Sequence, residues 1–300
     1  EVMLLDSAHI QEKEAEWREQ ARKSGKSIRN HFAEPLYSVP QAHACLERLR
    51  AVDYDAEFSP KQGVRCRLRD AGHILGAAII ELWISESGRE KKMVFSGDIG
   101  RAGHPIVRDV TPIEDADILL VESTYGDRLH RNLSDTMTEL ETALNETLSR
   151  RRGNVIVPAF AVGRTQDLLY LLSDLYRQKR LPPLYVYVDS PMALKATEIT
   201  LKHAELLDTE TRTMFNWLRM NRERPQINFI HDVDESMALA NIKSGAVIIS
   251  ASGMCTGGRI KHHLANNLGR KECAVIFTGF QANGTLGRRI VDGAKSVRIF

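Results

Sequence analysis

Strand-like and helix-like segments alternate regularly through the second half of the chain. Short apolar runs bounded by Gly, Asp or Ser lie between stretches with helical spacing. The expected helices cover residues 133–150, 164–177, 192–206, 234–243, 259–268 and 285–291, and the expected strands cover 154–157, 184–188, 227–230, 246–250 and 274–278. Because strands that alternate with helices pair in parallel, the pattern predicts a mainly parallel, doubly wound α/β sheet.

The first part of the chain has a different pattern. Helical spacing over residues 4–23 is followed by a second expected helix, which Pro40 opens and which runs through Arg50. Short β-branched or apolar runs then predict strands at 64–69, 77–84, 93–95 and 117–121. The pattern of this region therefore predicts half of a layered α/β sandwich.

Composition sets broad limits on the class of protein. The 300 residues are enough for about two domains, and 43% hydrophobic with 27% charged residues is ordinary for a globular protein. The net charge of +2 does not by itself indicate nucleic-acid binding. Four cysteines without a Cys-x-x-Cys pair argue against a zinc finger or a disulfide framework, and fit a cytoplasmic location. No apolar run is long enough to span a membrane, so we expect no membrane partner.

Three motifs follow one another at the ends of the strands expected in the first part. They are Ala-Gly-His73-Ile-Leu-Gly, Phe-Ser-Gly-Asp98-Ile-Gly and Val-Glu122-Ser-Thr-Tyr-Gly-Asp127. Taken singly, His73 is typical of a structural histidine, Asp98 of a turn, and Glu122 of a helix cap or a surface ion pair. Because loops at strand ends are positioned by a rigid sheet, the three motifs together predict one shared site.

The three motifs in this order resemble the β-CASP branch of the metallo-β-lactamase superfamily, whose members cut RNA and DNA. Segments 5–12, 158–164 and 252–259 also resemble family segments, so the resemblance covers nearly the whole chain. It implies that His73 is a zinc ligand and that Asp98 is a carboxylate ligand bridging two zinc ions. It also implies that Glu122 orients a catalytic histidine rather than binding metal. All three residues are therefore candidate catalytic residues.

Other metal-binding segments of the family do not occur in this sequence. These are the His-x-His-x-Asp-His segment, a Ser-Ala-His-Ala-Asp-like segment and a later His-Gly pair. We therefore expect a central portion of a longer protein, with two zinc ions in the complete protein and an incomplete ligand set here. The resemblance implies a partial metallo-β-lactamase domain at 1–128, an inserted β-CASP domain at 129–292 and a return to the first domain at 293–300. Family-like neighbourhoods without an assigned role surround Asp6, Ser123, Tyr125 and His130.

Three loops of the second half place Gly, a hydroxyl side chain and Arg just before a helix. Helix N-termini and arginine side chains both bind phosphate, and in a doubly wound sheet such loops gather along one edge. We therefore predict a row of phosphate sites that leads single-stranded RNA toward the metal centre; capping and close packing are the alternative. The candidate RNA-binding residues are Arg164, Ser252, Thr256, Arg259, Thr285 and Arg288. Phe160 and Phe280 lie in the same loops and either stack on bases or belong to the core, and we favour the core.

These features predict a zinc-dependent ribonuclease of RNA processing that hydrolyses phosphodiester bonds of single-stranded RNA. One alternative is a catalytically silent RNA-binding scaffold, and another is a small-molecule metallo-hydrolase such as a thioesterase or lactonase. The Arg-bearing loops favour the nuclease, because a small acyl substrate does not need an extended phosphate track. A homodimer is a further expectation.

Overall fold

The computed structural model describes residues 1–24, 34–129 and 132–300, so His130 lies outside the described residues. The chain divides into two compact units, Glu1–Val52 and Asp53–Phe300. The first unit contains the helices α1 (Val2–Lys23) and α2 (Val39–Leu46). Pro40 lies in the first turn of α2, as predicted, but the helix ends at Leu46 and not at Arg50. Among the described residues, no helix has the length and apolar character needed to cross a membrane.

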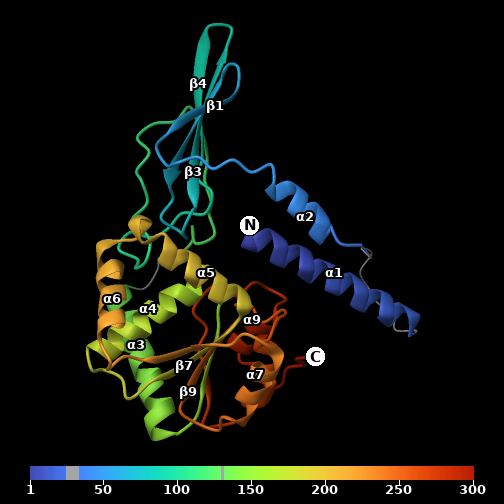
Figure 1. The fold of residues 1–300 in the computed structure, drawn as a ribbon, viewed down its shortest axis with the longest axis vertical. Coiled ribbons are helices and arrows are strands. Elements are labelled where there is room, and N and C mark those ends of the chain that lie inside the picture. Colours follow the sequence, from blue (N-terminus) through green and yellow to red (C-terminus); the bar gives the residue numbers. More distant parts are fainter. Residues whose placement is uncertain (25–33, 130–131) are drawn as a thin grey trace. The chain divides into compact units, whose positions relative to one another are not determined.

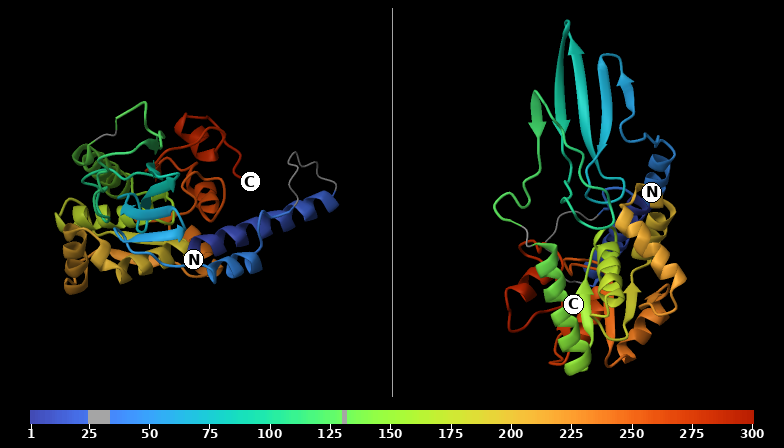
Figure 2. Two further views of the ribbon diagram at one scale, coloured as in Figure 1. Left: turned by 90° about the horizontal axis from the view of Figure 1, so that it is seen from above. Right: turned by 90° about the vertical axis from the view of Figure 1, so that its left-hand side faces the viewer.

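A five-stranded mixed sheet opens the second unit (Figure 2). Its strands, in sheet order, are β1 (Glu57–Lys61), β2 (Val64–Asp70), β3 (Ala78–Glu86), β4 (Arg89–Phe95) and β5 (Ile118–Leu120). The first four pair antiparallel, and β5 is parallel to β4. Four of these strands were predicted. The pattern did not reveal β1, because Glu-Phe-Ser-Pro-Lys contains a proline; a proline is tolerated here since β1 is an edge strand.

A buried ionic cluster fixes the pairing of β2, β3 and β4. The side chain of Glu81 in β3 is 2% exposed and accepts hydrogen bonds of 2.8 Å from Arg67 Nε of β2 and 2.8 Å from Lys92 Nζ of β4. Burial alone would raise the pKa of Glu81, but the bonds from Arg67 and Lys92 outweigh it and lower that pKa. Because a shift of one residue would break both bonds, the cluster specifies the register that positions the loops after β2 and β4.

The second sheet is entirely parallel, with the order β10-β6-β9-β7-β8. Two of its strands, β7 and β9, are labelled in Figure 1. The strands are β6 (Val155–Pro158), β7 (Tyr185–Asp189), β8 (Gln226–Phe229), β9 (Ala246–Ser250) and β10 (Ala274–Val275). Every residue of β6 and β9 is buried, as expected for strands covered by helices on both faces. The predicted α/β class and the doubly wound parallel sheet are confirmed.

Helices cover both faces of this parallel sheet. They are α3 (Leu133–Asn145), α4 (Arg164–Arg177), α5 (Pro191–Lys202), α6 (Thr209–Met220), α7 (Val233–Ala238), α8 (Ile260–Asn267) and α9 (Leu286–Val291). One apolar core joins α3, α4 and α5 to the sheet, and a second joins α8 to its other face. Helix α6, capped by the side chain of Asp208, was not predicted. Its first turn fixes the segment that follows the Asp98 loop, because Thr211 Oγ1 accepts a 3.0 Å hydrogen bond from Ile106 N.

The domain boundaries stay a prediction. The boundary at 128/129 falls in the connection between β5 and α3, after the mixed sheet and before the parallel one.

Candidate active site

The loops that carry His73 and Asp98 touch through their backbones. His73 lies in the loop after β2, and Asp98 lies in the loop after β4. Gly100 N donates a 2.8 Å hydrogen bond to Ala71 O. A Cβ atom on Gly100 would lie only 1.6 Å from Gly72 O, so glycine is required for this approach. The structure therefore brings the two predicted metal ligands onto neighbouring loops.

Glu122 follows β5 and binds the loop that carries Asp98. Its Oε1 atom accepts a 2.7 Å hydrogen bond from Ile99 N, and its own N–H donates a 3.0 Å bond to Ser96 Oγ. The Ile99 N–H is the main reason that the pKa of Glu122 is lowered, and the nearby His73 imidazole contributes to the same effect. The third predicted residue is thus an ionised carboxylate beside the other two, and it positions the backbone next to Asp98.

His73 and Asp98 have the right chemistry for part of a metal site. Both are exposed, and an imidazole and a carboxylate are donors that zinc takes. A catalytic zinc ion needs about three protein ligands. Throughout the described part of the chain, no group of three or more His, Cys, Asp or Glu side chains is placed to hold a metal ion. The described residues therefore fit a zinc site in part.

A buried carboxylate that the sequence did not reveal lies close to the same loops. Asp167 is in the first turn of α4 and is 9% exposed. Its carboxylate lies 3.3 Å from Arg164 Nη1 and 3.8 Å from His104 Nδ1. Burial raises the pKa of Asp167, and the charges of His104, Arg164 and His73 only partly oppose that rise. An acid in the first turn of a helix is ordinary, so its spacing gave no signal.

The three Arg-bearing loops meet around residue 253. Gln281 Nε2, from the third loop, donates a 3.0 Å hydrogen bond to Gly253 O in the second loop. A Cβ atom on Gly253 would lie 3.1 Å from the ring of Phe160 in the first loop. Gly287 N donates a further 3.1 Å bond to Met254 O. The strand ends of the parallel sheet therefore present the loops as one continuous surface.

The candidate RNA-binding residues differ in how far the protein already satisfies them. Ser252 Oγ and Thr256 Oγ1 lie 3.3 Å apart at the surface of the second loop. Thr285 caps α9 by accepting a 3.2 Å hydrogen bond from Arg288 N, as expected if this residue caps a helix and does not bind phosphate. Each candidate arginine has a carboxylate partner: Arg164 with Asp167 at 3.3 Å, Arg259 with Asp189 at 2.7 Å and Arg288 with Asp292 at 2.7 Å. A phosphate would share these arginines with the protein.

Asp189 ties Arg259 into the interior. It stands at the end of β7, is 1% exposed, and accepts hydrogen bonds from Arg259 Nη1 at 2.7 Å and from Ser236 Oγ at 2.6 Å. The buried His263 Nε2 lies 2.6 Å from the same carboxylate. Burial alone would raise the pKa of Asp189, but its bonds with His263, Ser236 and Arg259 lower it. The sequence does carry a signal for Asp189, because this acidic residue stands at the end of a strand, while Asp98 and Glu122 follow the ends of theirs within three residues.

The preference for Phe160 and Phe280 as core residues is wrong. Phe160 is 47% exposed and Phe280 is 40% exposed. Both precede helices on the loop surface, where a side chain has water on one side. Their loop backbones are instead held by hydrogen bonds, as in the 2.8 Å bond from Thr165 Oγ1 to Phe160 O.

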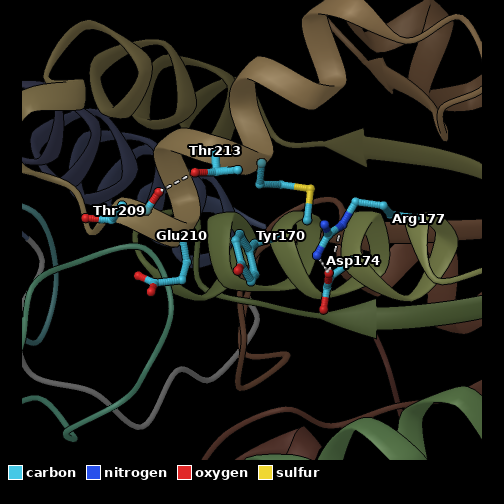
Figure 3. Close-up of a pocket in the computed structure, with 7 residues that line it drawn as sticks. Tyr170, Asp174, Arg177, Thr209, Glu210 and Thr213 are labelled. Atoms are coloured by element: carbon cyan, nitrogen blue, oxygen red, sulfur yellow. Dashed lines mark hydrogen bonds and ion pairs between the residues drawn. The ribbon is translucent and has the colours of Figure 1, made fainter.

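A separate pocket of about 210 Å³ lies between α4 and α6 (Figure 3). Tyr170, Asp174 and Arg177 line it from α4, and Glu210 and Met214 are among its lining residues from α6. Arg177 Nη2 is 2.7 Å from Asp174 Oδ1, so the charges within it are partly paired. None of the predicted site residues lines this pocket, which places it outside the candidate active site.

Comparison with known proteins agrees with the parallel sheet and its loops. Residues 165–290 match the model of the Beta-Casp domain. The chain belongs to the β-CASP family. It is 33% identical over 267 residues to Ribonuclease TTHA0252 of Thermus thermophilus, which covers 89% of this chain and 60% of that protein. It is 31% identical over 268 residues to the RNase J-like protein of Methanocaldococcus jannaschii, with 88% and 60% covered.

Relatives of a second kind are also found in the family. The chain is 30% identical over 286 residues to the Transcription termination factor FttA of Methanocaldococcus jannaschii, covering 93% of this chain and 43% of that protein. The chain thus spans about three fifths of the length of its two ribonuclease-like relatives and less of the termination factor.

Proposed function

We propose that the whole protein is a zinc-dependent ribonuclease of RNA processing that hydrolyses phosphodiester bonds of single-stranded RNA. The observation that carries this proposal is the cluster formed by the His73, Asp98 and Glu122 loops. The single surface formed by the three Arg-bearing loops of the parallel sheet lies in the same compact unit and supports it. Two relatives whose names describe a ribonuclease or an RNase J-like protein support the choice of RNA.

Each residue of the cluster has a distinct part in this proposal. His73 and Asp98 contribute two of the ligands for zinc, and bound zinc ions supply Lewis-acid stabilisation of charge at the phosphate. Glu122 holds the Asp98 loop through Ile99 N and presents a negative charge to His73, which favours a fixed orientation of both side chains. Arg164 lies at the start of α4, where the helix dipole adds to its attraction for a phosphate.

Cleavage by an Asp98→Asn variant of the full-length protein tests the proposal. We expect loss of cleavage of an end-labelled single-stranded RNA and reduced zinc retention, while RNA binding persists. Asp234→Asn is a matched control, because Asp234 is an exposed aspartate in the first turn of α7. Undiminished cleavage by Asp98→Asn would remove Asp98 from the mechanism.

The small-molecule alternative has its own test. Hydrolysis of a thioester or lactone well above the rate of RNA cleavage would overturn the nuclease proposal. A cytoplasmic location and a homodimer stay predictions.

A further inference from the structure

We propose that Phe160, Phe280 and Tyr125 form a stacking site for unpaired nucleobases beside the candidate active site. This inference rests on the proposed function, because it takes single-stranded RNA as the ligand. It adds contacts to bases, whereas the arginine-bearing loops provide contacts to phosphate.

Exposure of the rings is the first observation. Phe160 is 47% exposed and Phe280 is 40% exposed, although each lies on a loop held by the hydrogen bonds described above. Leaving a large apolar ring in water on an ordered loop gains no burial energy. A ligand with a flat apolar face would cover these rings and gain that energy.

Gly253 brings the two phenylalanine loops together. The Phe160 ring leaves only 3.1 Å to the position where a Cβ atom on Gly253 would lie. The carbonyl oxygen of Gly253 accepts the 3.0 Å bond from Gln281, the residue after Phe280. Gln281 is 7% exposed and donates a second bond of 3.3 Å to Gly279 O, so the backbone on both sides of Phe280 is fixed. The site is therefore preformed.

Tyr125 connects the aromatic group to the candidate active site. The ring centroids of Tyr125 and Phe280 are 6.2 Å apart with an interplanar angle of 86°, an edge-to-face contact. Such a contact leaves at least one face of the Phe280 ring uncovered by Tyr125, and a base can stack on that face. Tyr125 is three residues after Glu122, whose carboxylate binds the Asp98 loop. A base stacked here would belong to a nucleotide close to the metal ligands.

Charge around the rings favours a nucleotide over an uncharged apolar ligand. Arg164 is four residues after Phe160, its side chain is 38% exposed, and Arg288, 41% exposed, follows Phe280 on α9. Stacking on aromatic rings next to a basic surface is how proteins bind single strands without reading their sequence. Bases of a duplex are already stacked on one another, so the site selects unpaired RNA.

Binding of two RNA probes by the full-length protein tests this inference. One probe is a short single-stranded RNA, and the other is the same strand with abasic residues, so both carry the same phosphates. We expect the wild-type protein to prefer the strand that carries bases. Phe280→Leu and Phe160→Leu are each expected to weaken its binding about tenfold and to reduce the preference, because stacking of one base is worth about 1–3 kcal/mol. The salt dependence of binding should not change, since no charge is removed.

Tyr185→Leu is the matched control. Tyr185 is 50% exposed, but it is the first residue of β7 and so lies at the end of the strands opposite the loops. Its replacement should therefore leave the affinity for both probes unchanged. Equal wild-type binding of the two probes would overturn the inference even if RNA is cleaved. A preference for bases that survives in both phenylalanine variants would also overturn it. Loss of the preference for bases in these variants supports the inference. This result would stand even if the protein did not cleave RNA and the proposed function were refuted.

Discussion

The main expected effect of replacing Arg259 by alanine is a loss of fold stability, and not a direct loss of RNA binding. The side chain of Asp189 is 0% exposed and that of Arg259 is 23% exposed, with 2.7 Å between Oδ1 and Nη1. Removing one partner of a buried ion pair typically costs about 3–5 kcal/mol, because the other charge stays buried and unpaired. Because His263 and Ser236 remain beside the carboxylate, we expect the substitution to lower the free energy of unfolding by about 2–3 kcal/mol.

Urea unfolding of the full-length protein, followed by circular dichroism, measures this loss. Arg288→Ala is the matched control, since the Arg288–Asp292 pair has the same 2.7 Å separation but is 41% and 52% exposed. An exposed pair of this kind is worth about 0–1 kcal/mol. Equal and small effects of the two substitutions would refute the reasoning, and Arg259 would then be best explained as a phosphate contact.

Acid should act on the same ion pair. Because the folded pKa of Asp189 is lower than its unfolded value of about 3.9, its contribution to stability is complete above that value. It is lost as the pH falls through the folded pKa. Asp189→Asn should therefore be less stable than wild type at neutral pH, and the difference should shrink below about pH 4. A difference that stays constant down to about pH 2 would contradict a charged Asp189.

Three further substitutions test the candidate site and its support. Gly100→Ala should destabilise the protein strongly and reduce cleavage, because its Cβ would lie 1.6 Å from a carbonyl oxygen; Gly269→Ala, with nothing within 4 Å, is the control in urea unfolding. Glu122→Gln should lower kcat on single-stranded RNA about 10- to 100-fold, as for other partners that orient metal ligands, and an unchanged kcat would count against that role. Lys92→Met should cost about 1–3 kcal/mol in urea unfolding, since buried Glu81 keeps only its arginine contacts; a cost near zero would remove Lys92 from the ionic cluster.

The parts of the fold that the sequence predicted are those with the strongest periodic patterns. Strand β9 was predicted with its observed bounds, because a strand buried on both faces is an uninterrupted apolar run. Helix α4 was also predicted to the residue, since it carries one broad apolar face. The edge strand β1 and helix α6 were missed, because the proline of β1 and the many charged or polar residues of α6 conceal their patterns.

Long-range pairing explains what the sequence could not predict at the site. The neighbouring positions of His73, Asp98 and Glu122 follow from their shared place at strand ends. Nothing local indicates that Arg259 meets Asp189, which lies 70 residues earlier in the chain. The exposure of Phe280 likewise depends on how three separate loops meet, so an apolar residue type alone pointed to the core.

Because Gly72 and Gly100 are in contact, the main chain alone sets the distance between the loops that carry His73 and Asp98. No side chain separates these loops, so substitutions at positions 73 and 98 can change the donor atoms without moving the loops apart. The same backbone would thus accept other donor pairs, with side-chain rotamers adjusting to the radius of the ion. In the proposed zinc enzyme, metal preference is therefore expected to respond to single substitutions at these two positions, while a substitution at either glycine is expected to weaken the site for every metal.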